Sequence, residues 1–326
     1  MVGSHIVAEL LTRGYRNIVV TVRSAQAADK FRLKMKSMNV DASSVVTCDV
    51  ELCNPHEVNE LLNEGDILIH CAAQVALGSG NGQEMIETNT RITSVLVDCG
   101  IRQKIRVMVH MSSIATFESR EYPQLTDESS FARNVSSWNP YAKSKFYSEN
   151  QVWRGIRSGL NCVIVNPAVI LGLGDRNSSS VATILDLVSH KFPFYTDGAS
   201  GYVDVRDVAQ ASILLAETPE AYGQRYLISA HNLSHFELMS KLAEQLGNKP
   251  PHIKCSRQVL YAISNIEAIV AAITFRQQKF SKHMVRSITS RSAYGSSLLK
   301  KTTGFEYRSL EDTLNYLIKE YRLGSI

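Results

Sequence analysis

A serine, a tyrosine and a lysine in this chain have the side chains and the spacing needed for proton transfer to a substrate oxygen. Ser113 ends the run 109–113, Tyr141 follows 28 positions later, and Lys145 lies four residues beyond Tyr141. A tyrosine titrates at about pH 10, and a nearby ammonium favours its phenolate. Tyr141 could then exchange a proton with a substrate hydroxyl or carbonyl while Ser113 holds the same oxygen. A Tyr-x-x-x-Lys pair alone is also common on protein surfaces.

The elements that must position these residues alternate along the chain. Short β-branched runs with almost no polar interruption are typical of buried parallel strands. We predict strands over 18–22, 44–47, 66–71, 106–111, 161–165 and 225–228, and helices over 55–62, 89–99 and 141–158. This alternation predicts an α/β protein with a doubly wound parallel sheet.

Three predicted elements converge on one crevice. Ser113 and Pro167 both follow predicted strands, and ligands of open α/β sheets bind beyond the carboxyl ends of the strands. Tyr141 and Lys145 are four residues apart and so share one face of a helix. We therefore expect the serine, the tyrosine and the lysine to face the same ligand.

The alternating pattern also suggests a division of the chain. We expect a dinucleotide-binding domain over 1–174 that regains residues 201–230. Residues 175–200 and 231–326 have more helix and loop, and we expect most of the substrate-binding region there.

Composition excludes several classes of function. The 326 residues are 44% hydrophobic and 20% charged, with a net charge of +4, and they show no basic footprint for nucleic acid. Six cysteines without a C-x-x-C pair indicate a reducing compartment with neither disulfides nor zinc. His70, His110 and His190 stand apart in the sequence without ligand spacing, so we assign them to packing or to the surface and expect no metal.

The most apolar late stretch runs from Val259 to Phe275. It contains Asn265 and Glu267 and is short for a bilayer span, so we expect no membrane span here. We predict a buried or lid-like helix, and contact with a membrane surface is the alternative.

With these motifs, the chain resembles the extended short-chain dehydrogenase/reductases, the superfamily of NAD-dependent epimerases and dehydratases. The resemblance implies a Rossmann-like fold, a small-molecule substrate and a cytoplasmic homodimer. It assigns the catalytic triad to Ser113, Tyr141 and Lys145, with Ser112 as the second candidate for the serine.

The same resemblance implies a set of cofactor contacts. Asp49 and Val50 match the pair that contacts adenine, and Ala72 and Ala73 match a small-residue strand end that the cofactor approaches closely. The remaining residues of the expected cofactor site are Gly3, Arg23, Lys30, Asn89, Tyr141, Lys145, Pro167 and Val169.

The end of the second strand predicts which dinucleotide is used. An acidic residue there holds the ribose of NAD, whereas an arginine accommodates the 2′-phosphate of NADP. Arg23 stands at this position and Lys30 follows, so we predict NADP, with NAD as the alternative. A solvated basic helix start is the competing interpretation.

The beginning of the chain departs from the glycine-rich pattern of a dinucleotide-binding turn. Gly3 matches the last glycine of a G-x-x-G-x-x-G turn, but neither the earlier glycines nor the first strand precede it. We expect an incomplete start, with a shortened form that binds the cofactor weakly as the alternative.

Three functions remain open at this point. The leading one is an NAD(P)-dependent oxidoreductase that moves hydride between nicotinamide and a secondary alcohol or ketone. The second is a nucleotide-sugar epimerase or dehydratase with retained NAD, which the lack of an arginine in 197–201 disfavours. The third is a catalytically impaired remnant or binding protein.

Overall fold

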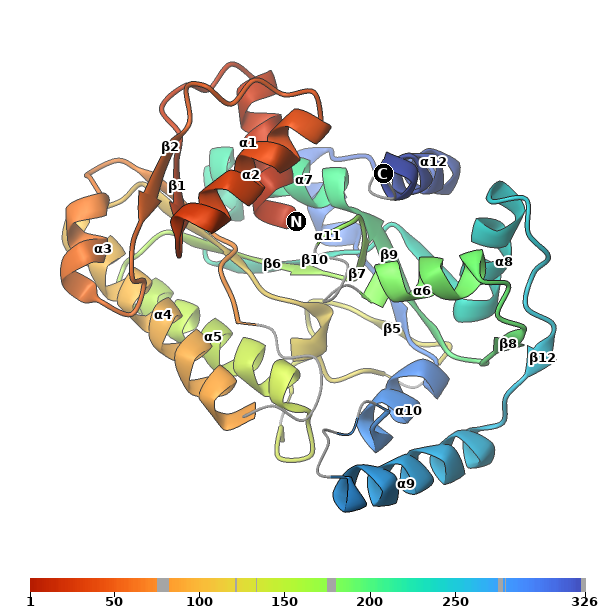
Figure 1. Cartoon of the computed structure of the whole chain (residues 1–326). Coiled ribbons are helices and arrows are strands. Elements are labelled where there is room, and N and C mark those ends of the chain that lie inside the picture. Colours follow the sequence, from red (N-terminus) through yellow and green to blue (C-terminus); the bar gives the residue numbers. More distant parts are fainter. Residues whose placement is uncertain are drawn as a thin grey trace.

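The computed structural model describes all residues except 75–81, 121, 133, 175–179, 275–277, 279 and 324–326. Its centre is a parallel sheet with the strand order β10-β6-β4-β3 (Figure 1). The strands are β3 (Ile67–His70), β4 (Val107–Met111), β6 (Cys162–Pro167) and β10 (Gln224–Ile228). All six residues of β6 are buried, as expected for a strand covered on both faces.

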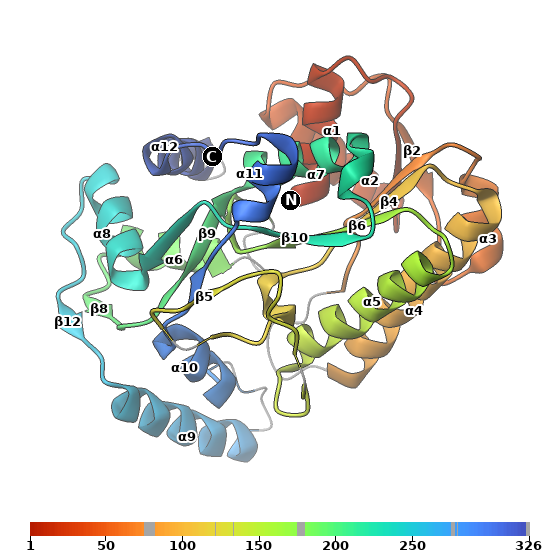
Figure 2. The ribbon, with the colours of Figure 1, turned by 180° about the vertical axis from the view of Figure 1, so that it is seen from behind.

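Helices cover both faces of this sheet, as Figures 1 and 2 show. One face carries α4 (Gly82–Gln103) and α5 (Pro140–Arg157), and the other carries α1 (Val2–Thr12), α7 (Val205–Glu217) and α11 (Ser297–Thr303). A separate apolar cluster fills the space on each side of the sheet. The prediction of a doubly wound α/β fold is confirmed, and the predicted strand ends lie within two residues of those observed.

A second parallel pair stands beside the main sheet. β1 (Val19–Val22) pairs with β2 (Val46–Asp49), and α2 (Ala25–Ser37) and α3 (Pro55–Leu61) follow them in turn. Among the described residues no strand pairs with the free edges of β1 and β3, so a division separates this pair from the main sheet. Helix α1 lies against α7 and α2 on one side of this division.

The rest of the chain forms a second layer with its own apolar core. Its main sheet has the order β11-β9-β7, and β12-β8 and β13-β5 form two separate two-stranded sheets. Its strands are β5 (Leu125–Thr126), β7 (Val169–Leu171), β8 (Phe194–Tyr195), β9 (Ala199–Asp204), β11 (His231–Ser234), β12 (Ile253–Lys254) and β13 (Ala293–Tyr294). Its helices are α6 (Ser180–Ser189), α8 (His235–Gln245), α9 (Arg257–Ile273), α10 (Lys282–Thr289) and α12 (Leu310–Leu323), and short 3-10 turns η1 (Ile114–Thr116) and η2 (Pro219–Ala221) lie elsewhere in the chain.

Helix α9 lies at the outer edge of the molecule, with α10 beside it (Figures 1 and 2). The expected helix over 259–275 is present, but a fully buried position is wrong, because Ile266 and Ile269 are each 62% exposed. None of the helices in the described part of the chain is long and apolar enough to cross a membrane.

Candidate active site

Ser113 and Tyr141 meet beyond the carboxyl end of β4. Ser113 lies two residues after the end of this strand and caps η1, where its Oγ accepts a hydrogen bond from the backbone N–H of Ala115 at 3.2 Å. Tyr141 lies in the first turn of α5, which Asn139 caps by accepting from the N–H of Ala142 at 2.8 Å. The Ser113 side chain lies close enough to the Tyr141 hydroxyl to lower the pKa of the phenol. The structure thus brings together two residues that are 28 positions apart in the sequence.

The pKa of Tyr141 lies above its ordinary value. Burial raises it, and the nearby Ser113 side chain lowers it by less. Burial is the largest of these influences, so the pKa of the phenol is raised before any cofactor binds. At neutral pH, Tyr141 is therefore a protonated phenol and a proton donor.

Lys145 lies on the same face of α5, one turn after Tyr141. Its side chain is buried, and Nζ donates a hydrogen bond to the carbonyl oxygen of Met111 at 2.9 Å. Burial lowers the pKa of Lys145 to about 8, although Cys71 and Glu149 act in the opposite direction. The ammonium therefore holds the end of β4 from the helix that carries the tyrosine.

Glu149 is a buried carboxylate that the sequence analysis missed. Its Oε2 accepts hydrogen bonds from Ser112 Oγ at 2.8 Å, from Thr116 Oγ1 at 3.0 Å and from Asn166 Nδ2 at 3.0 Å. Arg225 pairs with Oε1 at 3.4 Å. Its position one turn after Lys145, on the same helix face, was the available signal.

The Glu149 network separates the roles of the two adjacent serines. Ser112 is buried and donates to the carboxylate, so its hydroxyl is engaged within the protein. Ser113 is partly exposed, and its carbonyl oxygen accepts from Asn166 Nδ2 at 3.2 Å. The geometry favours Ser113 over Ser112 as the serine that faces a ligand.

The expected pyrophosphate site lies where α1 begins. Gly3 packs against the end of β3, and a Cβ built on it would lie 3.7 Å from Cys71 Cβ. No side chain caps the start of α1, so its first N–H groups remain available to an anion. The small residues Ala72 and Ala73 continue from the same strand end. Helix start and strand end thus fit a bound pyrophosphate.

The expected adenosine contacts lie at the ends of the outer pair of strands. Val22 and Asp49 are register partners in β1 and β2, so Arg23 and Asp49 stand at neighbouring strand ends. Arg23 and Asp49 are exposed, as is Lys30 in the second turn of α2, whereas Val50 is buried. A guanidinium such as that of Arg23 matches the geometry of a phosphate group.

The remaining predicted cofactor residues are Asn89, on helix α4, and Pro167 and Val169, on strands β6 and β7. Asn89 is buried, and its amide accepts from the Gln74 N–H at 2.7 Å and donates to the Gln74 carbonyl at 2.9 Å. It therefore fixes the chain that follows Ala73. Pro167 ends β6 opposite Ile228, and Val169 begins β7.

His70 and His110 are neighbours, so the view of them as isolated is wrong. They are register partners in β3 and β4, and their ring centroids are 5.2 Å apart. Both are buried, and burial lowers the pKa of each ring, to about 3 for His70. Their packing role agrees with the assignment from sequence. His190 is exposed just after the end of α6, where its Nδ1 lies 2.7 Å from the Asp186 carbonyl oxygen.

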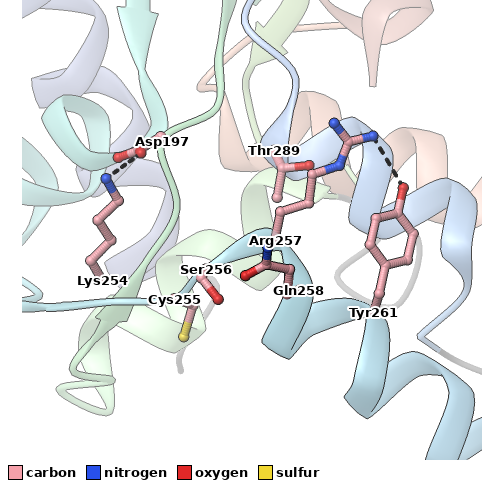
Figure 3. A pocket seen from close by; sticks show the side chains of 8 residues that line it. All are labelled: Asp197, Lys254, Cys255, Ser256, Arg257, Gln258, Tyr261 and Thr289. Carbon is pink, nitrogen blue, oxygen red and sulfur yellow. Dashed lines mark hydrogen bonds and ion pairs between the residues drawn. The ribbon is translucent and has the colours of Figure 1, made fainter.

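A separate pocket of about 540 Å³ opens near the start of α9 (Figure 3). Lys254 and Asp197 form an ion pair in its wall, and Arg257 donates to the Tyr261 hydroxyl at 3.3 Å. The lining residues are Asp197, Lys254, Cys255, Ser256, Arg257, Gln258, Tyr261 and Thr289. None of the predicted triad or cofactor residues lines this pocket.

Comparison with known proteins identifies the family of the chain, two relatives and a similar solved structure. The profile of the NAD dependent epimerase/dehydratase family matches residues 1–229. The chain is 27% identical to cinnamoyl-CoA reductase 1 of Petunia hybrida over 78% of its own length and 77% of the relative's. It is also 27% identical to sterol demethylase protein B of Methylococcus capsulatus, over 93% and 89% of the two chains. The fold is similar to that of yeast methylglyoxal/isovaleraldehyde reductase Gre2 complexed with NADPH, with a TM-score of 0.76, 16% identity and coverage of 99% and 96%.

Proposed function

The chain belongs to the NAD dependent epimerase/dehydratase family, and from this membership we propose that it is an NADPH-dependent carbonyl reductase. It is an enzyme, an NAD(P)-dependent oxidoreductase of the extended short-chain dehydrogenase/reductase superfamily. The observation that carries the proposal is the meeting of Ser113 with Tyr141, with Lys145 one turn further along the same helix.

The proposed chemistry gives each of the three residues one task. NADPH, when bound, supplies the hydride to the carbonyl carbon. Ser113 donates a hydrogen bond to the carbonyl oxygen and orients it. Tyr141 transfers its phenolic proton to that oxygen, a role that suits a phenol whose burial keeps it protonated. Lys145 holds the ribose hydroxyls of the dinucleotide and places a positive charge near the phenol.

The chain also offers the donors that NADP needs. The uncapped start of α1 beside Gly3 would receive the pyrophosphate, and Arg23 would receive the 2′-phosphate. Ala72 and Ala73 would admit the dinucleotide close to the backbone, and Asn89 would fix that segment from behind. Lys30, Asp49, Val50, Pro167 and Val169 complete the proposed site.

The proposed substrate is a ketone or aldehyde of low charge. No arginine is present in 197–201, so this segment offers no guanidinium for a sugar nucleotide. The names of the two relatives, a cinnamoyl-CoA reductase and a sterol demethylase component, agree with a largely apolar reacting group. We place the substrate-binding region in residues 175–200 and 231–326 and the dinucleotide-binding domain in 1–174 with 201–230. We also propose a homodimer in the cytoplasm, where six free thiols suit the reducing conditions.

Two measurements on the purified chain test this proposal. Titration of NADPH and NADH, followed by tryptophan quenching, should show binding of both with tighter binding of NADPH. A panel of uncharged ketones and aldehydes should then give carbonyl-dependent oxidation of NADPH. If neither dinucleotide binds, the reductase proposal is wrong. A protein purified with tightly held NAD that acts on sugar nucleotides would favour the epimerase alternative.

A further inference from the structure

Helix α9, at the outer edge of the molecule (Figures 1 and 2), buries Leu260 but exposes its other described large aliphatic side chains. Ile266 and Ile269 point to solvent and are each 62% exposed, whereas Ser264 and Ala271 are buried. Surface helices of globular proteins normally bury their large aliphatic side chains and expose their small or polar ones. The outward face of α9 is therefore suited to contact with another apolar body.

The exposed residues form a continuous ridge. Their spacing of three, four or seven positions places them along one side of the helix. Each is between 42% and 62% exposed, and no charged residue lies among them. The members of this α9 ridge are Val259, Ile263, Ile266, Ile269 and Val270.

Hydrogen bonds on the opposite side hold the ridge outward. Ser264 Oγ donates to the Phe280 carbonyl at 2.8 Å, and Gln278 Nε2 donates to the Ser264 carbonyl at 2.9 Å. Glu267 accepts from the Phe280 N–H at 2.6 Å. Rolling the helix to bury the ridge would break these bonds, so its exposure is built into the fold.

The sequence segment that contains the ridge is rich in positive charge. Residues 248–291 contain eight of the 35 Lys and Arg residues and one of the 31 Asp and Glu residues. This segment thus has a formal charge of +7, whereas the rest of the chain has −3. Helix α10, which packs against α9, exposes Lys282 and Arg286, and Arg257 is exposed at the start of α9.

We propose that the α9 ridge docks this enzyme on the surface of an anionic lipid bilayer. The ridge would lie parallel to the membrane between headgroups and acyl chains, and the flanking basic side chains would contact lipid phosphates. A second copy of the chain fits less well, because two copies of this surface would oppose positive charge to positive charge. The proposal concerns a surface away from the triad, so it does not depend on the reductase assignment.

Flotation of the purified chain with vesicles tests the proposal. We expect wild-type protein to float with vesicles of phosphatidylcholine and phosphatidylglycerol, and not with phosphatidylcholine alone. The double variant Ile266→Asn, Ile269→Asn should stay with the unbound fraction. Leu33→Asn is the matched control, because Leu33 is 66% exposed on α2 and should be replaceable without loss of flotation.

A charge variant provides a second readout that leaves the ridge intact. Lys282→Glu with Arg286→Glu should lower vesicle affinity by at least roughly 20-fold, since each basic residue strengthens binding to an anionic surface about fivefold. Affinity for NADPH and the thermal unfolding midpoint should stay at wild-type values in both double variants.

Several results would overturn the docking proposal. The proposal is wrong if wild-type protein does not float with anionic vesicles. It is also wrong if neither double variant weakens flotation. Sedimentation velocity without vesicles measures the oligomeric state of the wild-type chain and of the ridge variants. If the ridge variants convert a dimer to a monomer, the ridge is an interface between copies of the chain and the membrane assignment is wrong.

Discussion

The Lys145 ammonium donates a hydrogen bond to the carbonyl oxygen of Met111, with 2.9 Å between Nζ and O. This bond joins α5, which carries Tyr141, to the end of β4, which leads to Ser113. Glu149 makes a second connection between the same elements through Ser112 at 2.8 Å. Residues far apart in the sequence are thereby held together before any ligand binds, which is the preorganisation that proton transfer requires.

The titration of Lys145 should shape the pH profile of the enzyme. Its pKa is lowered to about 8, so the ammonium is lost as pH rises through this value. We expect kcat/KM, which reports groups of the free enzyme, to fall above about pH 8. Because Glu149 raises the pKa of Lys145, Glu149→Gln should move this falling limb to lower pH. The exposed Glu60→Gln serves as the control, and an unmoved limb in Glu149→Gln would refute the electrostatic link.

The two adjacent serines should respond differently to substitution. Ser113→Ala should lower kcat by about 10- to 100-fold through loss of one hydrogen bond in the transition state, with little change in stability. Ser112→Ala removes a donor to buried Glu149, so it should lower the free energy of unfolding by about 1–3 kcal/mol. Steady-state kinetics and urea unfolding distinguish the two. The reverse pattern would make Ser112 the catalytic serine.

Arg23 should decide the preference for NADP. Arg23→Asp removes a charged hydrogen-bond donor and adds a like charge near the 2′-phosphate, so NADPH affinity should fall by about 10- to 100-fold. NADH affinity should stay the same or rise. Arg32→Asp is the control, because Arg32 is exposed on α2 and pairs with Asp29. Equal losses for both dinucleotides would remove Arg23 from the 2′-phosphate site.

Much of this arrangement could be predicted from the sequence, because it depends on local patterns. Apolar runs located the strands, and the four-residue spacing of Tyr141 and Lys145 placed them on one helix face. The Glu149 network could not be derived in this way. Its partners Thr116, Asn166 and Arg225 come from separate elements, and only the folded sheet brings them to one carboxylate.

The side of α9 that faces solvent could not be predicted from the sequence either. Its apolar composition predicted a helix but not which side faces water, because periodicity gives relative positions on a helix and not the direction of the core. The bonds from Ser264 and Glu267 to Phe280 determine that direction, and they depend on the chain returning beside α9.

Arg225 should contribute strongly to stability. Its guanidinium lies 4.1 Å from the ring centroid of Phe117 and 3.9 Å from that of Phe131, and it pairs with buried Glu149. Arg225→Met would leave that carboxylate without its cation, which costs about 3–5 kcal/mol. Arg154→Met, which breaks the exposed pair with Asp98, should cost less than about 1 kcal/mol. Urea unfolding of both variants compares the costs, and similar losses would contradict a special role for the buried pair.

The central claim is that Tyr141 gives its proton to the substrate oxygen. Tyr141→Phe removes only the phenolic hydroxyl, and Tyr147→Phe is the control, because Tyr147 is exposed on the same helix. The most direct measurement is single-turnover oxidation of enzyme-bound NADPH by the best carbonyl substrate. We predict that the rate falls by about 10²–10⁴-fold in Tyr141→Phe, with NADPH affinity unchanged and Tyr147→Phe at the wild-type rate. A wild-type rate in Tyr141→Phe would contradict the account.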